Sequence, residues 1–196
     1  MLVLKKIAIL CSIFFAFSCN TKSKEYAPIG KDNDELFNLY FNDQEDRMID
    51  YIEWDYVHKR DSLRRVRVHQ LIDSNRIRTS KDYKNAAMIF QHGKDSTDYG
   101  LAVRLISKSI ELDSTQHKWL FAATTDRYLL SKGKPQIYGT QYKRNWDEPW
   151  RLAKIDTTKI SDEERVKFGV ETLVEQQEKV KLLNEKLNKK NKKDYD

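Results

Sequence analysis

The chain has 196 residues, two cysteines and a formal net charge of +6. This length supports one ordinary hydrophobic core and therefore a single domain. Two lysines lie in an apolar leader and seven lie in residues 179–196, so the rest of the chain is nearly neutral. A nucleic acid is therefore not the expected partner.

The first nineteen residues, MLVLKKIAILCSIFFAFSC, have the pattern of an export signal. Lys5 and Lys6 precede an apolar run that is shorter than the roughly 20 residues needed to cross a membrane. A cysteine at the end of this run resembles a bacterial lipoprotein signal, in the loose form familiar from the Bacteroidota. We therefore expect residues 1–18 to be a lipoprotein signal peptide.

Cys19 is then expected to be acylated and to anchor the protein in a lipid bilayer of the bacterial cell envelope, at the outer membrane. The alternative is a secreted protein whose cysteine is incidental. Because Cys11 leaves with the signal, the mature chain cannot form an internal disulfide or a thiolate metal cluster. Residues 19–33 contain proline and glycine without periodicity, which predicts a tether.

Residues 34–187 are predicted to form one helical domain, because apolar residues recur at helical spacing. The first stretch, from Asp34 to near Asn75, predicts one long helix or two helices joined by a kink. Thr79 and Ser80 can cap a second helix that ends at 92–93. Two more helices are expected at 99–112 and 116–131, in a pattern that resembles tetratricopeptide-type helix hairpins over about one and a half units.

The segment GKPQIYGTQY, residues 133–142, interrupts this helical pattern with two glycines and a proline. Beyond it, Ser161 and Glu164 form a predicted capping box at the start of a long last helix. Residues 188–196 are expected to be a basic, disordered tail. No stretch alternates with period two, so the predicted class is all-α: an irregular helical bundle with long first and last helices.

Charged side chains on faces that should be buried mark the candidate site. Asp43 and Arg47 form an i,i+4 pair on the apolar face of the first helix. His92 lies on the buried side of its helix. Asp126 points the same way as the apolar residues Trp119, Ala122 and Ala123, and Arg127 is next to it in the sequence. The candidate ligand-binding residues are Asp43, Gln44, Arg47, Gln91, Arg127, Gln136, Tyr138, Thr140 and Gln141, and the candidate catalytic residues are His92 and Asp126.

Four motifs in this order, NDQEDR, AAMIFQHG, TTDRYLL and GKPQIYGTQ, followed by SDEERVKFGV, resemble a bacterial family known only as a domain of unknown function. The resemblance covers roughly Leu36 to Leu183. It implies that the motif residues share a site, but it implies no reaction.

Several functions fit such a site. A buried polar network could simply fix the helices. A pocket with two arginines and several amides suits a small polar or anionic ligand, with Tyr138 and Trp146 as an apolar wall. An enzyme of a hydrolase type could use His92 as general acid or base, oriented by Asp126 or Asp43. A helical surface could also bind a protein. We expect no metal and no cofactor.

Overall fold

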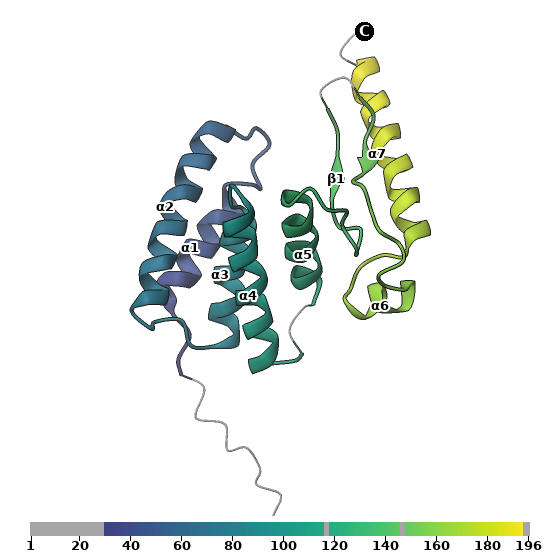
Figure 1. Ribbon diagram of the computed structural model, residues 1–196. Coiled ribbons are helices and arrows are strands. Elements are labelled where there is room, and N and C mark those ends of the chain that lie inside the picture. Colours follow the sequence, from purple (N-terminus) through teal and green to yellow (C-terminus); the bar gives the residue numbers. More distant parts are fainter. Residues whose placement is uncertain (1–29, 116–117, 146–147, 194–196) are drawn as a thin grey trace, which may run out of the picture.

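The computed structural model describes residues 30–115, 118–145 and 148–193, with side chains up to residue 189. Within these ranges it contains seven helices and one two-stranded sheet, so the prediction of an all-α class is confirmed. Helices α1 to α5 pack together, and the sheet lies with α6 and α7 on the far side of α5 (Figure 1). The elements are α1 Asp34–Glu45, α2 Trp54–Asp73, α3 Ser80–Gln91, α4 Ser96–Leu112, α5 Trp119–Ser131, β1 Tyr142–Lys143, β2 Arg151–Leu152, α6 Asp162–Lys167 and α7 Leu173–Lys193.

The first helical stretch is divided into α1 and α2, which lie side by side (Figure 1). The side chain of Asn33 caps α1 by accepting a hydrogen bond from Leu36 N at 3.0 Å. Residues 46–53 are not helical and reverse the direction of the chain. Helix α2 then runs back along α1. Of the two predicted forms, two helices are therefore present, with a turn rather than a kink between them.

Helix α3 begins at the predicted cap and is the centre of the N-terminal bundle. Thr79 and Asp82 form a capping box. The buried Asp82 also accepts a hydrogen bond from Asn33 N at 2.8 Å, which ties the starts of α1 and α3 together. Small residues on α3 and α4 allow these helices to pack closely as the predicted hairpin. The buried apolar core consists of Leu36, Val68, Leu71, Ile77, Ala86, Ala87, Ile89, Phe90, Ala102, Leu105, Ile106 and Leu120.

The C-terminal part is built around a second, smaller apolar cluster of Ala122, Tyr138 and Val170. The antiparallel strands β1 and β2 pair Tyr142 with Leu152. The capping box predicted at Ser161 starts α6, but this helix ends at Lys167, and the last long helix is the separate α7. Helix α7 continues to Lys193, so most of the tail expected to be disordered at residues 188–196 is helical.

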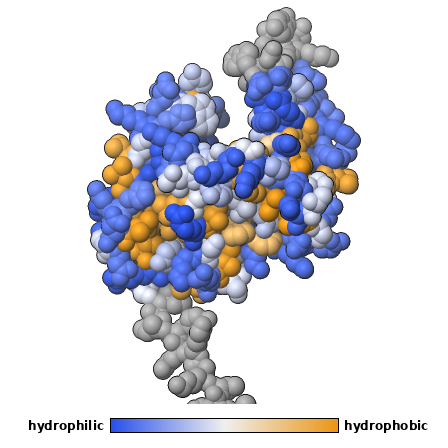
Figure 2. Space-filling model, in the orientation of Figure 1, coloured by the Kyte–Doolittle hydropathy of each residue, from blue (hydrophilic) through white to orange (hydrophobic). Residues whose placement is uncertain are grey.

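The surface is mostly hydrophilic in the view of Figure 2, which also shows a hollow between the α2 side of the molecule and its C-terminal part. Across the described ranges, no helix combines the length and the apolar character that a membrane span requires.

Candidate functional site

A cationic cleft opens where the end of α3 meets α2 and α5. It consists of two adjoining hollows of about 360 and 400 Å³ that share His58, Asp61, His92 and Gly93. The first hollow also reaches Arg65 and Lys94, and the second reaches Arg47, Trp54 and Arg127. Four permanently cationic side chains therefore line the cleft against one carboxylate, that of Asp61. Two of the four are already paired, Arg65 with Asp98 at 3.1 Å and Arg47 with Asp43 and Asp61. The cationic surplus comes from Arg127 and Lys94, and it favours an anionic occupant.

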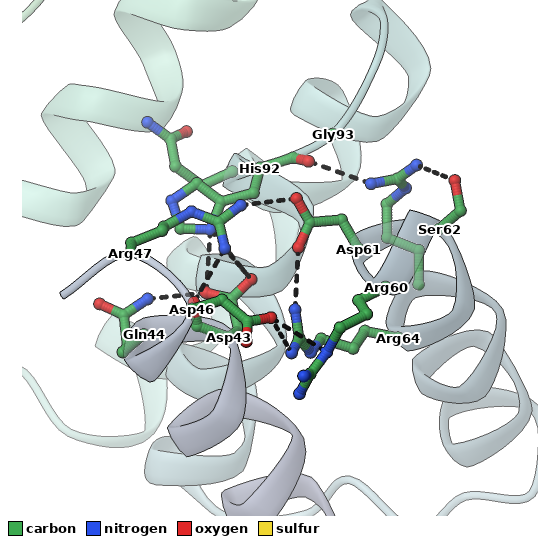
Figure 3. A network of polar contacts seen from close by, with 12 residues as sticks. Asp43, Gln44, Asp46, Arg47, Arg60, Asp61, Ser62, Arg64, His92 and Gly93 are labelled. Atoms are coloured by element: carbon green, nitrogen blue, oxygen red, sulfur yellow. Dashed lines mark hydrogen bonds and ion pairs between the residues drawn. The ribbon is translucent and has the colours of Figure 1, made fainter. Parts of the chain in front are cut away.

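Arg47 forms one wall of the cleft and joins α1 to α2 (Figure 3). Its Nη1 donates to the Asp43 carboxylate at 3.2 Å and to the Asp43 backbone oxygen at 2.8 Å. Its Nη2 donates to Asp61 Oδ2 at 2.6 Å. Both carboxylates are buried, so each needs such a partner to offset the loss of water.

The ionic network extends behind Arg47 through the buried Arg64. Arg64 Nη1 donates to the second oxygen of Asp61 at 3.0 Å, and its Nη2 pairs with Asp46. Arg60 Nε lies 3.1 Å from the same oxygen of Asp46. The network therefore matches three arginines, at positions 47, 60 and 64, with three aspartates, at positions 43, 46 and 61. Its formal charges balance without a ligand.

His92, at the end of α3, is held by Asp43 rather than by Asp126. Its Nδ1 lies 2.9 and 3.1 Å from the two carboxylate oxygens of Asp43, while the ring remains 19% exposed at the cleft. Burial raises the pKa of the Asp43 carboxyl, but the hydrogen bond and charge of His92, with Arg47 and Gln44, bring this pKa below its usual value. With Nδ1 bound to a carboxylate, the other ring nitrogen is the one available to a ligand.

Arg127, on α5, lines the cleft but does not belong to the balanced network. Its Nη1 donates to the Gln91 backbone oxygen at 2.6 Å, and its Nε and Nη2 both donate to Gln141 Oε1 at 3.2 Å. Among the described residues, no carboxylate forms an ion pair with it. Burial lowers the pKa of Arg127; Tyr99 opposes this shift and the charge of Arg47 adds to it. The guanidinium also lies over the ring of Tyr99, 5.9 Å from its centroid. A mostly buried guanidinium that is held by neutral oxygens and an aromatic ring still lacks an anionic partner.

The glycine-containing segment is folded around Asp126. The carboxylate accepts hydrogen bonds from the backbone N–H groups of Ile137, Tyr138, Gly139 and Thr140 at 2.8 to 2.9 Å. The Thr140 hydroxyl donates a fifth, at 2.9 Å. Both oxygens of Asp126 are therefore engaged by the loop, and Asp126 is a loop-organising residue rather than the partner of His92.

Gly139 is required at the tightest point of this loop. Its φ is +91°, and a Cβ atom would lie 1.9 Å from Gln176 Oε1. The amide of Gln176 donates to the Tyr138 carbonyl at 2.9 Å, and the buried Arg165 donates to the same oxygen at 3.2 Å. Side chains from α6 and α7 thus close the loop from the other side.

The two glutamines of the segment connect the loop to the cleft. Gln136 is fully buried; its Oε1 accepts from Gln141 N at 3.0 Å and its Nε2 donates to Gln141 O at 3.0 Å. With its backbone fixed in this way, Gln141 donates its side-chain N–H to Thr140 Oγ1 at 2.9 Å and presents Oε1 to Arg127. The loop therefore positions Arg127 through Gln141.

The predicted site residues consequently fall into two groups. Asp43, Gln44, Arg47, His92 and Arg127 lie at or directly behind the cleft, and Gln91 contributes its backbone oxygen while its side chain is buried. The loop group consists of Asp126, Gln136, Tyr138, Thr140 and Gln141.

The loop group was predicted to contact a ligand or to take part in catalysis, but most of its hydrogen bonds hold the loop together, and only Gln141 contacts a residue of the cleft, Arg127. Tyr138 is buried against Phe121 and Phe168, at ring distances of 6.4 and 5.0 Å, and is not a wall of the cleft. Trp146, the other predicted wall residue, and the lipidation residue Cys19 lie outside the described residues.

The sequence interpretation missed the contribution of α2 to the site. The buried residues Val57, Asp61, Arg64, Val68 and Leu71 of α2 recur every three or four positions. Two charges inside an otherwise apolar stripe are the signal that could have identified them.

Three comparisons with known proteins give no match: neither a protein-family model, nor a curated protein, nor a solved structure is similar to this chain. The family resemblance of its four motifs stays a prediction.

Proposed function

We propose that the protein binds a small anionic ligand, with a phosphate or carboxylate group, in the cationic cleft. The observation that carries this proposal is Arg127, a mostly buried guanidinium that faces the cleft and forms no ion pair with any described carboxylate. An oxyanion would complete its hydrogen bonding as a charge-assisted pair. Arg47, which lines the same hollow, provides further donors.

Mutation of Arg127 tests this function. In NMR titrations of the full chain, inorganic phosphate or acetate is expected to shift the imidazole signals of His92 saturably. Arg127→Gln is expected to weaken this binding roughly ten- to hundredfold, because hydrogen bonds to charged groups contribute about 1.5 to 3 kcal/mol. Arg104→Gln, which removes an exposed arginine of α4, is the matched control and should bind as the parent does. Absence of binding by the parent, or unchanged binding by Arg127→Gln, would contradict the proposal.

A structural role is the second candidate, and a different observation favours it. The arginines and aspartates between α1 and α2 balance one another and are largely buried. We propose that this network fixes the angle between the two helices and thereby the width of the cleft. It therefore serves as the support of the binding site rather than as its ligand-contacting surface.

We also propose that the protein is a lipoprotein of the bacterial cell envelope, anchored at the outer membrane through acylated Cys19. The support is the sequence of residues 1–19, which lie outside the described part of the structure. In cell fractionation, the parent is expected in the membrane fraction, and Cys19→Ser should move most of the protein out of it. Equal membrane association of the two proteins would contradict the lipid anchor.

A further inference from the structure

A tryptophan lies beside the cationic groups of the cleft. Trp54, the first residue of α2, lines the same hollow as Arg47, His92 and Arg127 and remains 51% exposed. Its ring lies 5.8 Å from the ring of His58, at an interplanar angle of 35°. An indole is a large, rigid apolar surface, and a half-exposed one inside a cleft can still bury area against a ligand.

The connection that leads to Trp54 exposes further apolar side chains. Residues 48–53 connect Arg47 to Trp54, and both of these flanking residues line the cleft. Between these ends, Met48, Ile49 and Tyr51 are exposed. None of these three side chains lines the hollows, and the acidic Asp50 and Glu53 of the same connection are exposed as well. The aromatic surface of the cleft itself is therefore the ring of Trp54, which is more exposed than Arg127.

The size of the cleft also exceeds what an oxyanion alone would fill. Each hollow has a volume of about 360 to 400 Å³, at the lower end of the range of about 300 to 1,000 Å³ that is usual for small-molecule sites. A phosphate or carboxylate on Arg127 would leave the Trp54 side of the hollow unoccupied. The flat apolar surface that this side of the hollow offers to the rest of a ligand is the Trp54 ring.

We infer that the ligand carries an aromatic ring close to its anionic group, and that this ring packs on Trp54 while the oxyanion binds Arg127. This inference rests on the proposed anion binding and adds the chemical class of the ligand: an aryl phosphate or an aryl carboxylate. Offset or tilted contact between the two rings provides dispersion and removes apolar area from water.

Paired probes separate the ring from the charge. Phenyl phosphate is compared with inorganic phosphate, and benzoate with acetate, by NMR titration of the full chain. We expect each aryl probe to bind about tenfold more tightly than its simple counterpart, since an aromatic pair with its buried area contributes about 1.4 kcal/mol or more. The better of the two aryl probes identifies the oxyanion.

Substitution of Trp54 assigns the preference to this residue. Trp54→Ala is expected to bind phenyl phosphate no more tightly than inorganic phosphate, while Trp54→Phe retains most of the difference. Tyr56→Ala is the matched control, because Tyr56 is a similarly exposed aromatic residue, at 57%, on the same helix but outside the lining of the cleft. It should keep the full preference.

The failures of the two proposals are distinguishable. Binding of phosphate and phenyl phosphate with equal affinity would overturn the aromatic ligand and leave anion binding intact. A preference for the aryl probes that survives in Trp54→Ala would also overturn it. Absence of binding by all four probes would overturn anion binding itself, and with it the aromatic ligand.

Discussion

Replacing Asp126 with alanine is expected to lower the free energy of unfolding by about 4 kcal/mol or more. The substitution removes the acceptor of five hydrogen bonds, four of them from backbone N–H groups of residues 137–140. Each buried donor left without a partner costs about 1 to 3 kcal/mol, and losses above about 4 kcal/mol are confined to such defects. Water entering the space left by the carboxylate keeps the total below the simple sum.

Thermal unfolding of the full chain, followed by circular dichroism, measures this effect. For a chain of 150 to 250 residues, 1 kcal/mol corresponds to about 2 to 4 °C in Tm, so a decrease of roughly 8 to 16 °C is expected. Asp126→Asn retains one acceptor oxygen and should lie between the alanine variant and the parent.

Asp50→Ala, which removes an exposed aspartate from the segment before α2, is the control and should change stability by less than about 0.5 kcal/mol. A Tm for Asp126→Ala within 2 °C of the parent would contradict this account of the loop.

The loop around Asp126 also explains why a segment rich in polar residues need not be a binding surface. Gln136, Thr140 and Gln141 satisfy one another and the backbone, and only Gln141 extends a contact to the cleft, through Arg127. The residue types in GKPQIYGTQ are those of a ligand site, but a loop that buries its own backbone needs the same donors and acceptors.

Elements governed by local interactions were predictable from the sequence. The caps at Thr79 and Ser161 are decided by residues within three positions of each other, and both are present as expected. The pair of Asp43 and Arg47 is likewise local, because an i,i+4 spacing places the two side chains on one face of a helix.

The break between α1 and α2 was not predictable in this way, since residues 34–75 contain neither glycine nor proline. In a continuous helix the Arg47 N–H would bond to the Asp43 carbonyl. Here the Arg47 guanidinium occupies that carbonyl, and the Arg47 N–H bonds to Gln44 O at 3.0 Å. The competing partner, Asp61, is fourteen residues away, so the break depends on a tertiary contact.

The same break changes which apolar residues are inside. Met48, Tyr51, Leu63 and Val66 fit a helical stripe in the sequence, yet all four are exposed. Once α2 turns back along α1, its buried face is the one with Asp61 and Arg64, and the stripe with Leu63 and Val66 faces outward. His58 reaches the cleft for the same reason, so α2 could be assigned to the site only after its direction was known.

The second large effect is expected at Asp43, whose carboxylate holds His92 and Arg47 together. Asp43→Asn removes a fully buried charge. Arg47 and His92 are then left with an amide oxygen, which is a weaker acceptor than the carboxylate. Breaking one side of a buried ionic pair costs on the order of 3 to 5 kcal/mol. At neutral pH we expect a loss at the lower end of this range, because Asp61 still pairs with Arg47.

The pH dependence identifies the carboxylate as the cause. The pKa of Asp43 is lower in the folded protein than the usual 3.8, so the folded state favours the ionised form. Its contribution to stability is therefore fully present above about pH 4 to 5 and is lost as the pH falls through the lowered pKa of the folded state. The difference in free energy of unfolding between the parent and Asp43→Asn should accordingly shrink below about pH 4.

Urea unfolding of the full chain at pH 7 and at several values between pH 5 and pH 3 measures this difference. Asp50→Asn is the matched control: it removes one carboxylate at an exposed position and should show a small difference at every pH. If the parent and Asp43→Asn were equally stable at pH 7, Asp43 would not be the support of the cleft. If their difference instead persisted undiminished to pH 3, the loss would arise from packing of the asparagine rather than from the missing charge.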